Sequence, residues 1–299
     1  MSQIADIPEL TYQGAALDTS EFGRLRESTD LQDDPAALRA RMAEDGYLFI
    51  RGLLDRDAVM QARLEVMQQL ADDGKLDPSR PVIDGIPKPG VQMSFAPNYV
   101  KGAPSIRRVL YGERMMRFFD RYWGEPALHY DYTWFRCKSP GHSTATKPHY
   151  DIVYMGRGER DLAHTVWVPY GDVPMDMGGL IVLEGSHKHE DLRADYGQHD
   201  VDSSCRSGAK PKWDFGSYSH DIRPVQQEWG GRWLGADYRA GDVLIFSFFL
   251  MHASTDNNRD SLRLSSDSRY QVARGGIDDR WFGENPSAHG EKSHRELIC

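Results

Sequence analysis

The sequence predicts a mainly β fold, of the sandwich or barrel kind, with helices that flank it on the N-terminal side. After about residue 124, short apolar or alternating runs recur between Gly, Pro, Asp and Asn residues, which is typical of an all-β unit. Before that point the apolar residues repeat at helical spacing. With 299 residues, the chain is long enough to bury a large core in one or two domains.

Three helices are expected ahead of the β-half, after a polar and aperiodic arm over residues 1–33. Asp34 and Pro35 mark the first start, because Asp caps a helix and Pro suits its first turn. The three expected helices span 34–46, 55–73 and 106–123. They lie within a buttress over about 34–123 that braces the β-unit, so we expect residues 34–299 to form one domain.

Six runs in the second half are expected to be strands of a β-barrel over about 129–275. These runs span 129–137, 149–154, 164–168, 180–183, 243–249 and 262–272. A polar stretch over 190–239 follows the fourth run and is too long for an ordinary connection. We expect this stretch to be an insertion that covers the active site as a lid.

The composition argues against several classes of protein. Lys and Arg total 36 against 45 Asp and Glu, which does not favour binding to nucleic acid or to anionic membranes. No apolar run approaches the roughly 20 residues that span a bilayer, and no signal peptide is visible. Three cysteines without a CxxC spacing favour reduced thiols, so we expect a cytoplasmic protein.

A His-x-Asp pair with a distant His is the sharpest chemical signal. On a strand, residues i and i+2 point to the same face, so His149 and Asp151 would present an imidazole and a carboxylate side by side. A further His would complete the two-His, one-carboxylate set of non-haem Fe(II) oxygenases, which leaves three coordination positions open. His252, at the end of an apolar run, is the candidate for this third ligand.

The pair alone is a weak signal, because the chain contains three of them: His129/Asp131, His149/Asp151 and His189/Asp191. The pair at 189 lies in a charged segment that looks solvated, and the pair at 129 only precedes an aromatic strand. A His at the end of an apolar run is also more often a core residue than a ligand. What favours the pair at 149 is its position on a strand run and the residues that follow far downstream.

Those downstream residues include Arg263 and Ser265, which would share one face of the last strand. An Arg inside a β-core is costly unless it is paired, and its fork matches a carboxylate. The functional interpretation is an anchor for a carboxylate-bearing cosubstrate close to the metal. The alternative is a surface Arg on a β-edge with a neighbouring Ser.

Taken in order, these motifs resemble the phytanoyl-CoA dioxygenase (PhyH-like) family of Fe(II)/2-oxoglutarate oxygenases. The matching elements are Gly46-Tyr47, Arg51-Gly52-Leu53, His149-Tyr150-Asp151, Trp167-Val168-Pro169 with Asp172, Gly178-Gly179-Leu180, Gly185-Ser186-His187, Gly241-Asp242, His252, Asn257 and Arg263-x-Ser265. The resemblance covers roughly residues 35–275. The chain departs from the family at Glu184, where a Pro is usual, and 190–239 matches no family motif.

The resemblance implies a double-stranded β-helix, the jelly-roll of cupin-like barrels. It also implies that 2-oxoglutarate chelates Fe(II), that dioxygen takes the last metal position, and that the far carboxylate of 2-oxoglutarate is held by protein side chains. The implied iron ligands are His149, Asp151 and His252. The implied cosubstrate residues are Arg263, Ser265 and Thr165, the last at a position where relatives offer a hydroxyl.

The implied reaction is hydroxylation of an unactivated C–H bond in a small-molecule metabolite or natural-product intermediate, with release of succinate and carbon dioxide. Trp134, Arg136 and Trp167 are candidates for the substrate pocket, with core packing as the alternative for the first two. Arg269 is expected to close the core or to form a surface pair. Two other functions stay open: a jelly-roll that does not turn over, and a cosubstrate-independent metal protein that would leave Arg263 unexplained. The substrate and the oligomeric state are not readable.

Overall fold

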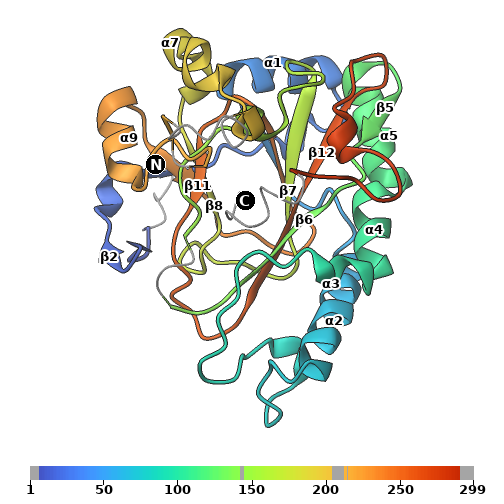
Figure 1. The fold of residues 1–299 in the computed structure, drawn as a ribbon, viewed down its shortest axis with the longest axis vertical. Helices are drawn as coiled ribbons and strands as arrows, with labels where there is room; N and C mark the ends of the chain where they lie inside the picture. Colours follow the sequence, from blue (N-terminus) through green and yellow to red (C-terminus); the bar gives the residue numbers. More distant parts are fainter. Residues whose placement is uncertain (1–6, 142–144, 204–211, 214, 290–299) are drawn as a thin grey trace.

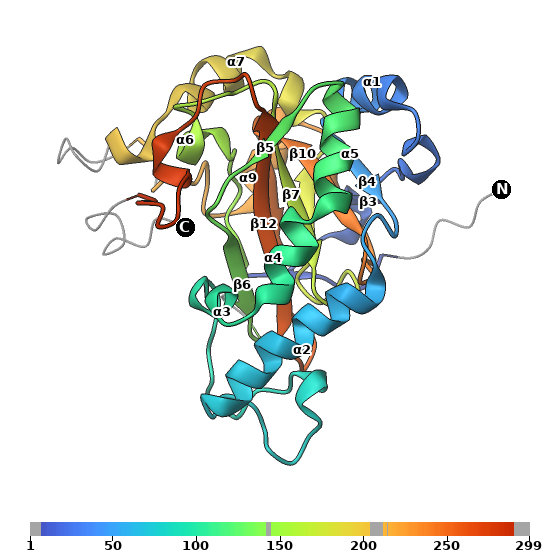
Figure 2. The same cartoon turned by 90° about the vertical axis from the view of Figure 1, so that its right-hand side faces the viewer.

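The computed structural model describes residues 7–141, 145–203, 212–213 and 215–289. Two β-sheets lie on either side of the molecule's centre, and helices cover the outer face of the larger sheet (Figure 1; Figure 2). This arrangement confirms the predicted jelly-roll class with flanking helices. The two sheets stay separate and do not close into one barrel.

The larger sheet has six strands in the order β4-β10-β7-β12-β5, and β6 pairs with β12 beside β5. The strands are β4 (Tyr47–Ile50), β10 (Val243–Ser247), β7 (Ala163–Pro169), β12 (Arg263–Val272), β5 (Ala127–His129) and β6 (Trp134–Lys138). All their pairings are antiparallel. Every residue of β12 is buried, because the sheet carries helices on one face and the interior of the molecule on the other.

The smaller sheet has four strands in the order β11-β8-β9-β3. They are β11 (His252–Ser254), β8 (Leu180–Leu183), β9 (Trp233–Gly235) and β3 (Phe22–Arg24). β3 and β9 pair in parallel, so part of the segment expected to be an N-terminal arm is a sheet strand. β9 likewise takes part of the expected insertion into the sheet. A short hairpin of β1 (Thr11–Tyr12) and β2 (Ala15–Ala16) precedes them.

Local sequence chemistry explains the first two long helices, α1 (Pro35–Asp45) and α2 (Arg56–Asp72). The Asp34 carboxylate accepts hydrogen bonds from two backbone amides of the first turn, and Gly46 ends α1 with a left-handed φ of 78°. Asp55 caps α2 in the same way. α2, α4 (Pro104–Tyr111) and α5 (Glu113–Trp123) lie over the larger sheet (Figure 2).

Two expectations about elements are wrong. The single helix over 106–123 is two helices, because the backbone turns to an extended conformation at Gly112, where a Cβ would lie 2.2 Å from the Arg108 carbonyl oxygen. The expected strand over 149–154 is a single bridge at His149 followed by α6 (Ile152–Met155). A short apolar run does not distinguish a buried strand from a buried helical turn.

The remaining short helices are α3 (Asn98–Lys101), α7 (Glu190–Ala194) and α9 (Ile222–Trp229). α7 and α9 belong to the polar stretch after β8 and lie at the edge of the molecule away from α2 (Figure 1). Within the described part of the chain, no helix has the length and apolar character needed to cross a membrane.

We predict that Gly46→Ala destabilises the fold more than Gly52→Ala. Both glycines have left-handed φ values, 78° and 60°, so each substitution carries a backbone cost of about 1–2 kcal/mol. A Cβ at Gly46 would also lie 2.5 Å from Nδ1 of His187, whereas nothing lies within 4 Å at Gly52. Overpacking of this kind adds about 1–3 kcal/mol. Urea unfolding of both variants measures the difference, and equal losses would contradict the predicted contact.

Candidate metal centre

The site is built on a backbone bridge between two distant segments. The amide of His149 donates to the carbonyl of His252 and the amide of His252 donates back, both at 3.1 Å. Such a reciprocal pair holds the two residues directly opposite each other. Their rings consequently lie 4.2 Å apart between centroids. Asp151 follows two residues after His149, where the chain enters α6.

The three side chains meet as a metal site requires. Nε2 of His149 lies 3.6 Å from Oδ1 of Asp151, and Nε2 of His252 lies 3.7 Å from the same oxygen. All three possible ligand atoms lie within 4.8 Å of one another, and the described residues contain no other such cluster of His, Cys, Asp or Glu. Two nitrogens and one oxygen suit Fe(II) as the sequence predicted.

Hydrogen bonds on the far side of each imidazole fix which nitrogen faces the cluster. Nδ1 of His149 lies 2.8 Å from the Lys147 carbonyl oxygen, and Nδ1 of His252 lies 2.9 Å from that of Leu250. A carbonyl oxygen only accepts, so each Nδ1 carries the proton and each Nε2 keeps a free lone pair. Histidines that bind metals are oriented in this way.

The electrostatics of the site favour a neutral imidazole at His252 and an ionised carboxylate at Asp151. Burial, reinforced by His149, lowers the pKa of His252 to about 3. Burial alone would raise the pKa of the Asp151 carboxyl, but Arg269 and the two histidines outweigh it and hold that pKa well below its usual range. At neutral pH His252 and Asp151 therefore have the protonation states that metal ligation needs.

Arg269 is the residue that the sequence interpretation missed. It is 4% exposed, neither on the surface nor simply closing the core, and its Nη2 lies 3.0 Å from Oδ2 of Asp151. Its guanidinium carbon lies 3.9 Å from the centroid of the Trp134 ring. The sequence did contain a signal: residues 263, 265, 267 and 269 alternate along one strand, so Arg269 shares the inward face with Arg263.

Thr165 also differs from its expected role. Its hydroxyl donates to Oδ2 of Asp151 and is fully buried. A hydroxyl has one proton, so in this geometry Thr165 orients the carboxylate and has no donor left for a keto acid. That Thr165 also contacts 2-oxoglutarate stays a prediction.

Arg263 lines the same cavity as the three triad residues, and Ser265 lies two residues further along β12. Arg263 is 1% exposed, donates to the Ser265 hydroxyl, and leaves its Nε without a partner among the described residues. Its guanidinium carbon lies 5.8 Å from the Trp167 ring centroid. Burial, with the nearby Arg136, lowers the pKa of Arg263 to about 10. The described residues offer it no carboxylate ion pair, so it is a buried cation that can take an anion.

Lys138 is a second buried cation that sequence reasoning did not find. It pairs in register with Arg263 across the β6–β12 ladder and is 2% exposed. Its ammonium donates to the Ser254 hydroxyl at 2.6 Å and to the Thr255 carbonyl at 2.8 Å. Burial, reinforced by Arg263 and Arg136, holds its pKa well below the usual value. Among the described residues, no carboxylate forms an ion pair with Arg263 or Lys138, so this pair of buried basic side chains could hold an anionic ligand.

The candidate pocket residues divide into two groups. Trp167 and Arg136 line the cavity next to the triad, and Arg136 pairs with Asp267 at 3.5 Å. Trp134 is 2% exposed and supports Arg269 instead of lining that cavity. The other two His-x-Asp pairs remain elsewhere: His129 stacks on Tyr111, and His189 packs against Trp229.

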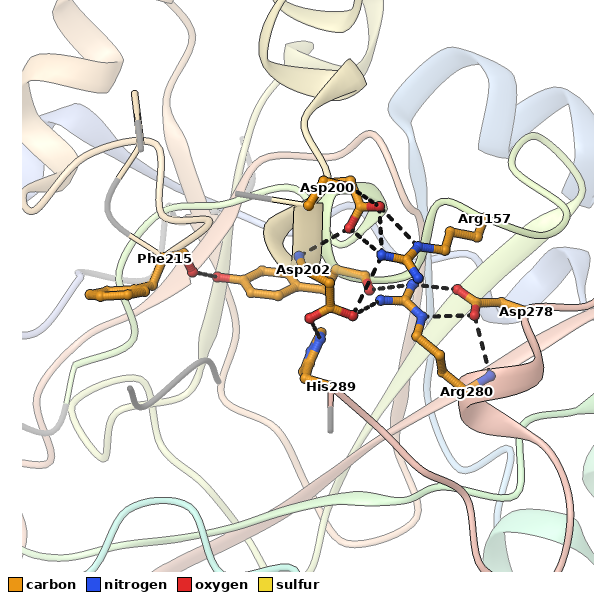
Figure 3. A network of polar contacts seen from close by, with 9 residues as sticks. Arg157, Asp200, Asp202, Phe215, Asp278, Arg280 and His289 are labelled. Carbon is orange, nitrogen blue, oxygen red and sulfur yellow. Dashed lines mark hydrogen bonds and ion pairs between the residues drawn. The ribbon is translucent and has the colours of Figure 1, made fainter. Parts of the chain in front are cut away.

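An ion-pair network next to the site holds the polar stretch after β8 and the C-terminal segment together (Figure 3). Asp202 accepts from Arg280 and, at 3.0 Å, from His289, while Arg157 pairs with Asp200 at 2.8 Å. Arg280 also donates to the Tyr154 carbonyl at 3.0 Å, in α6 directly after the triad's Asp.

Tyr154 connects this network to the triad. Its hydroxyl donates to the Phe215 carbonyl at 3.1 Å, and its ring meets that of His149 at 5.5 Å. The expected lid stays a prediction, and its residues 204–211 and 214 lie outside the described part of the chain.

The family comparison agrees with this site. The model of the phytanoyl-CoA dioxygenase (PhyH) family matches residues 42–265. The chain therefore belongs to that family, as the motifs predicted, and it is an oxygenase of the non-haem iron, 2-oxoglutarate-dependent class.

Two curated relatives share most of their length with the chain. The 1-deoxypentalenic acid 11-beta-hydroxylase of Streptomyces exfoliatus is 29% identical over 83% of this chain and 84% of its own. The enzyme of the same name from Streptomyces arenae is 26% identical over 85% of this chain and 87% of its own.

Solved structures share the fold. The non-haem α-ketoglutarate-dependent epimerase SnoN from nogalamycin biosynthesis has a TM-score of 0.56 at 21% identity, covering 85% of this chain and 93% of its own. EctD from S. alaskensis, solved with 2-oxoglutarate and 5-hydroxyectoine, has a TM-score of 0.55 at 18% identity, covering 97% and 92%. At such identities the likeness shows a common fold.

We predict that His149→Ala or Asp151→Ala abolishes binding of Fe(II) or Mn(II), because each removes one of three ligands from the only such cluster in the described residues. Anaerobic calorimetric titration measures the loss, and circular dichroism shows that the variants stay folded. His129→Ala and His189→Ala are matched controls and should bind metal as the unaltered chain does. Loss of binding in His129→Ala with retention in His149→Ala would contradict the assignment.

We predict that Arg280→Ala loosens the contact between the polar stretch after β8 and the segment over residues 278–289. The change removes the Arg280 ion pair of the buried Asp202, which keeps only the longer contact with Arg157 at 3.7 Å and the bond from His289, and so lowers the local opening free energy by about 2 kcal/mol, which means roughly thirtyfold faster amide exchange. Hydrogen exchange should therefore rise over residues 196–203 and 278–289 but not in β7 or β12. Arg274→Ala, which breaks an exposed pair with Glu125, is the control. Unchanged hydrogen exchange near Asp202 would show that the ion-pair network does not hold these two segments together.

Proposed function

We propose that this protein is an Fe(II)- and 2-oxoglutarate-dependent dioxygenase that hydroxylates a C–H bond of a small molecule, with release of succinate and carbon dioxide. The observation that carries the proposal is the pairing of two features within one cavity. A His149, Asp151 and His252 cluster with free Nε2 lone pairs lies beside Arg263, a buried guanidinium that forms no ion pair with a carboxylate of the described residues.

The donor set fits the metal on its own chemistry. Two neutral imidazoles and one carboxylate leave three positions of an octahedral ion open for cosubstrate and dioxygen. When bound there, Fe(II) supplies the redox chemistry that dioxygen activation requires. The chain's own part is to fix the ligands by the carbonyl contacts of the two histidines and to bury them away from bulk water.

The cosubstrate fits the cationic end of the cavity. We place the far carboxylate of 2-oxoglutarate on the fork of Arg263, with the Ser265 hydroxyl and the Lys138 ammonium beside it. Charge-assisted bonds to a carboxylate are about twice as strong as neutral ones, so this end sets both position and affinity. The keto-acid end then faces the triad, and Trp167 lines the same cavity with its ring centroid 5.8 Å from the Arg263 guanidinium carbon.

The substrate class rests on the relatives. The two curated relatives are named as hydroxylases of 1-deoxypentalenic acid, a small molecule, and this supports a small-molecule substrate here. Analysis of the substrate-derived product distinguishes hydroxylation from other oxidative outcomes.

The experiment is to mix the chain with Fe(II), ascorbate and 2-oxoglutarate, with and without candidate substrates, which should give succinate. Absence of succinate under all these conditions would favour a jelly-roll that does not turn over.

We predict that Arg263→Ala raises the half-saturating concentration of 2-oxoglutarate several hundredfold. Removing one side of a buried charged pair costs on the order of 3–5 kcal/mol. Arg263→Lys should recover only part of this loss, because Lys keeps the charge but not the fork. Lys138→Met should weaken binding in the same direction.

The measurement is anaerobic titration of the absorption band that forms when a keto acid chelates Fe(II). Metal affinity, titrated without the keto acid, is the internal control and should stay near that of the unaltered chain. An unchanged midpoint in Arg263→Ala would remove Arg263 as the anchor.

A further inference from the structure

We propose that Arg269 is a positioning residue of the metal centre, which holds Asp151 so that one carboxylate oxygen faces the metal and the other is kept away from it. The inference rests on the proposed function in one respect, because it takes the triad to bind a divalent metal. It adds a residue to the site that neither the motifs nor the family match assigns.

The two oxygens of Asp151 have different surroundings. Oδ1 lies 3.6 and 3.7 Å from the Nε2 atoms of the two histidines. Oδ2 instead accepts from the Arg269 guanidinium at 3.0 Å and from the Thr165 hydroxyl. With Oδ2 taken by two donors, Asp151 offers the metal a single oxygen, and the third open position is preserved.

The two residues that contact Oδ2 lie on paired strands, whereas Asp151 itself does not. Arg269 and Thr165 are directly opposite each other in the β7–β12 ladder, so their side chains leave the same face of the sheet about 5 Å apart. Asp151 lies where the chain enters a four-residue helix. Its carboxylate orientation is not set by sheet register, as that of a strand residue would be. The two strand residues therefore supply the orientation that the local backbone does not.

Arg269 is itself fixed on two further sides. Its Nη1 donates to the Asp267 carbonyl at 3.3 Å, and its plane lies over the Trp134 ring at 3.9 Å. A guanidinium that is stacked and hydrogen-bonded has little rotational freedom left. Lys could supply the charge at this position, but it could not supply the stacked plane with two directed donors.

The test is titration of the full chain with Mn(II) and Co(II), without oxygen or 2-oxoglutarate, so that the readout is metal binding alone. Arg269→Gln should raise the metal dissociation constant about 10–100-fold, as the loss of a residue that hydrogen-bonds a metal ligand does. The metal dissociation constant of Arg269→Lys should lie between those of Arg269→Gln and the unaltered chain. Thr165→Val removes the second donor at constant shape and should cost about tenfold.

The control separates positioning from stability. Arg63 is also a buried Arg, and its guanidinium donates to the carbonyls of Ile83 and Tyr170 away from the triad. Arg63→Gln should lower the unfolding temperature but leave the metal dissociation constant within about twofold. The Co(II) absorption spectrum is a second readout, and it should change in Arg269→Gln because a released Oδ2 alters the coordination.

The outcomes separate the two claims. If the unaltered chain binds neither metal, the proposed function fails and this inference fails with it. If the unaltered chain binds metal and Arg269→Lys and Arg269→Gln bind it equally well with the same Co(II) spectrum, Arg269 does not position Asp151 and the proposed function stands. If Arg269→Gln does not fold, Arg269→Lys decides: an unchanged dissociation constant and spectrum overturn the inference.

Discussion

The reciprocal backbone bridge between His149 and His252 is the constraint on which the rest of the site depends. It joins a loop to a strand of the smaller sheet across about a hundred residues of chain and places the two imidazole rings 4.2 Å apart between centroids, tilted by 56°. The bridge fixes the distance between the rings, and the carbonyls of Lys147 and Leu250 fix their tautomers. A ligand pair defined by main-chain hydrogen bonds is insensitive to side-chain repacking nearby, which suits a centre that must keep open positions.

The inner face of β12 is the second determinant, because it brings charge into the interior in a fixed order. Arg263, Ser265, Asp267 and Arg269 occupy every second position along it, and the residues between them face the helices. Asp267 is matched by Arg136, and Arg269 by Asp151, which leaves Arg263 with the neighbouring Lys138 as the unmatched end. One strand thereby contacts the metal-ligand candidate Asp151 at one end and carries the proposed carboxylate anchor Arg263 at the other.

The interior between two sheets makes these charges effective. Each of these charged groups is nearly or fully buried. Electrostatic interactions that would be weak at the surface are stronger in this interior, so they shift the pKa values of the groups and orient their side chains. The same burial makes an unmatched cation unfavourable until a carboxylate arrives. The proposed affinity for an anionic cosubstrate is in this sense a consequence of the burial of Arg263 between the two sheets.

The sequence by itself determined the fold class, the caps of the early helices at Asp34 and Gly46, and the three residues of the triad, because these depend on short-range patterns and on motif order. It did not determine the helical turn after Asp151, the break at Gly112, or the roles of Arg269 and Lys138. Those depend on burial and on cross-strand register, which join residues far apart in the chain. Tertiary structure alone decides which polar side chains face one another in the interior, and so which of them act on the site.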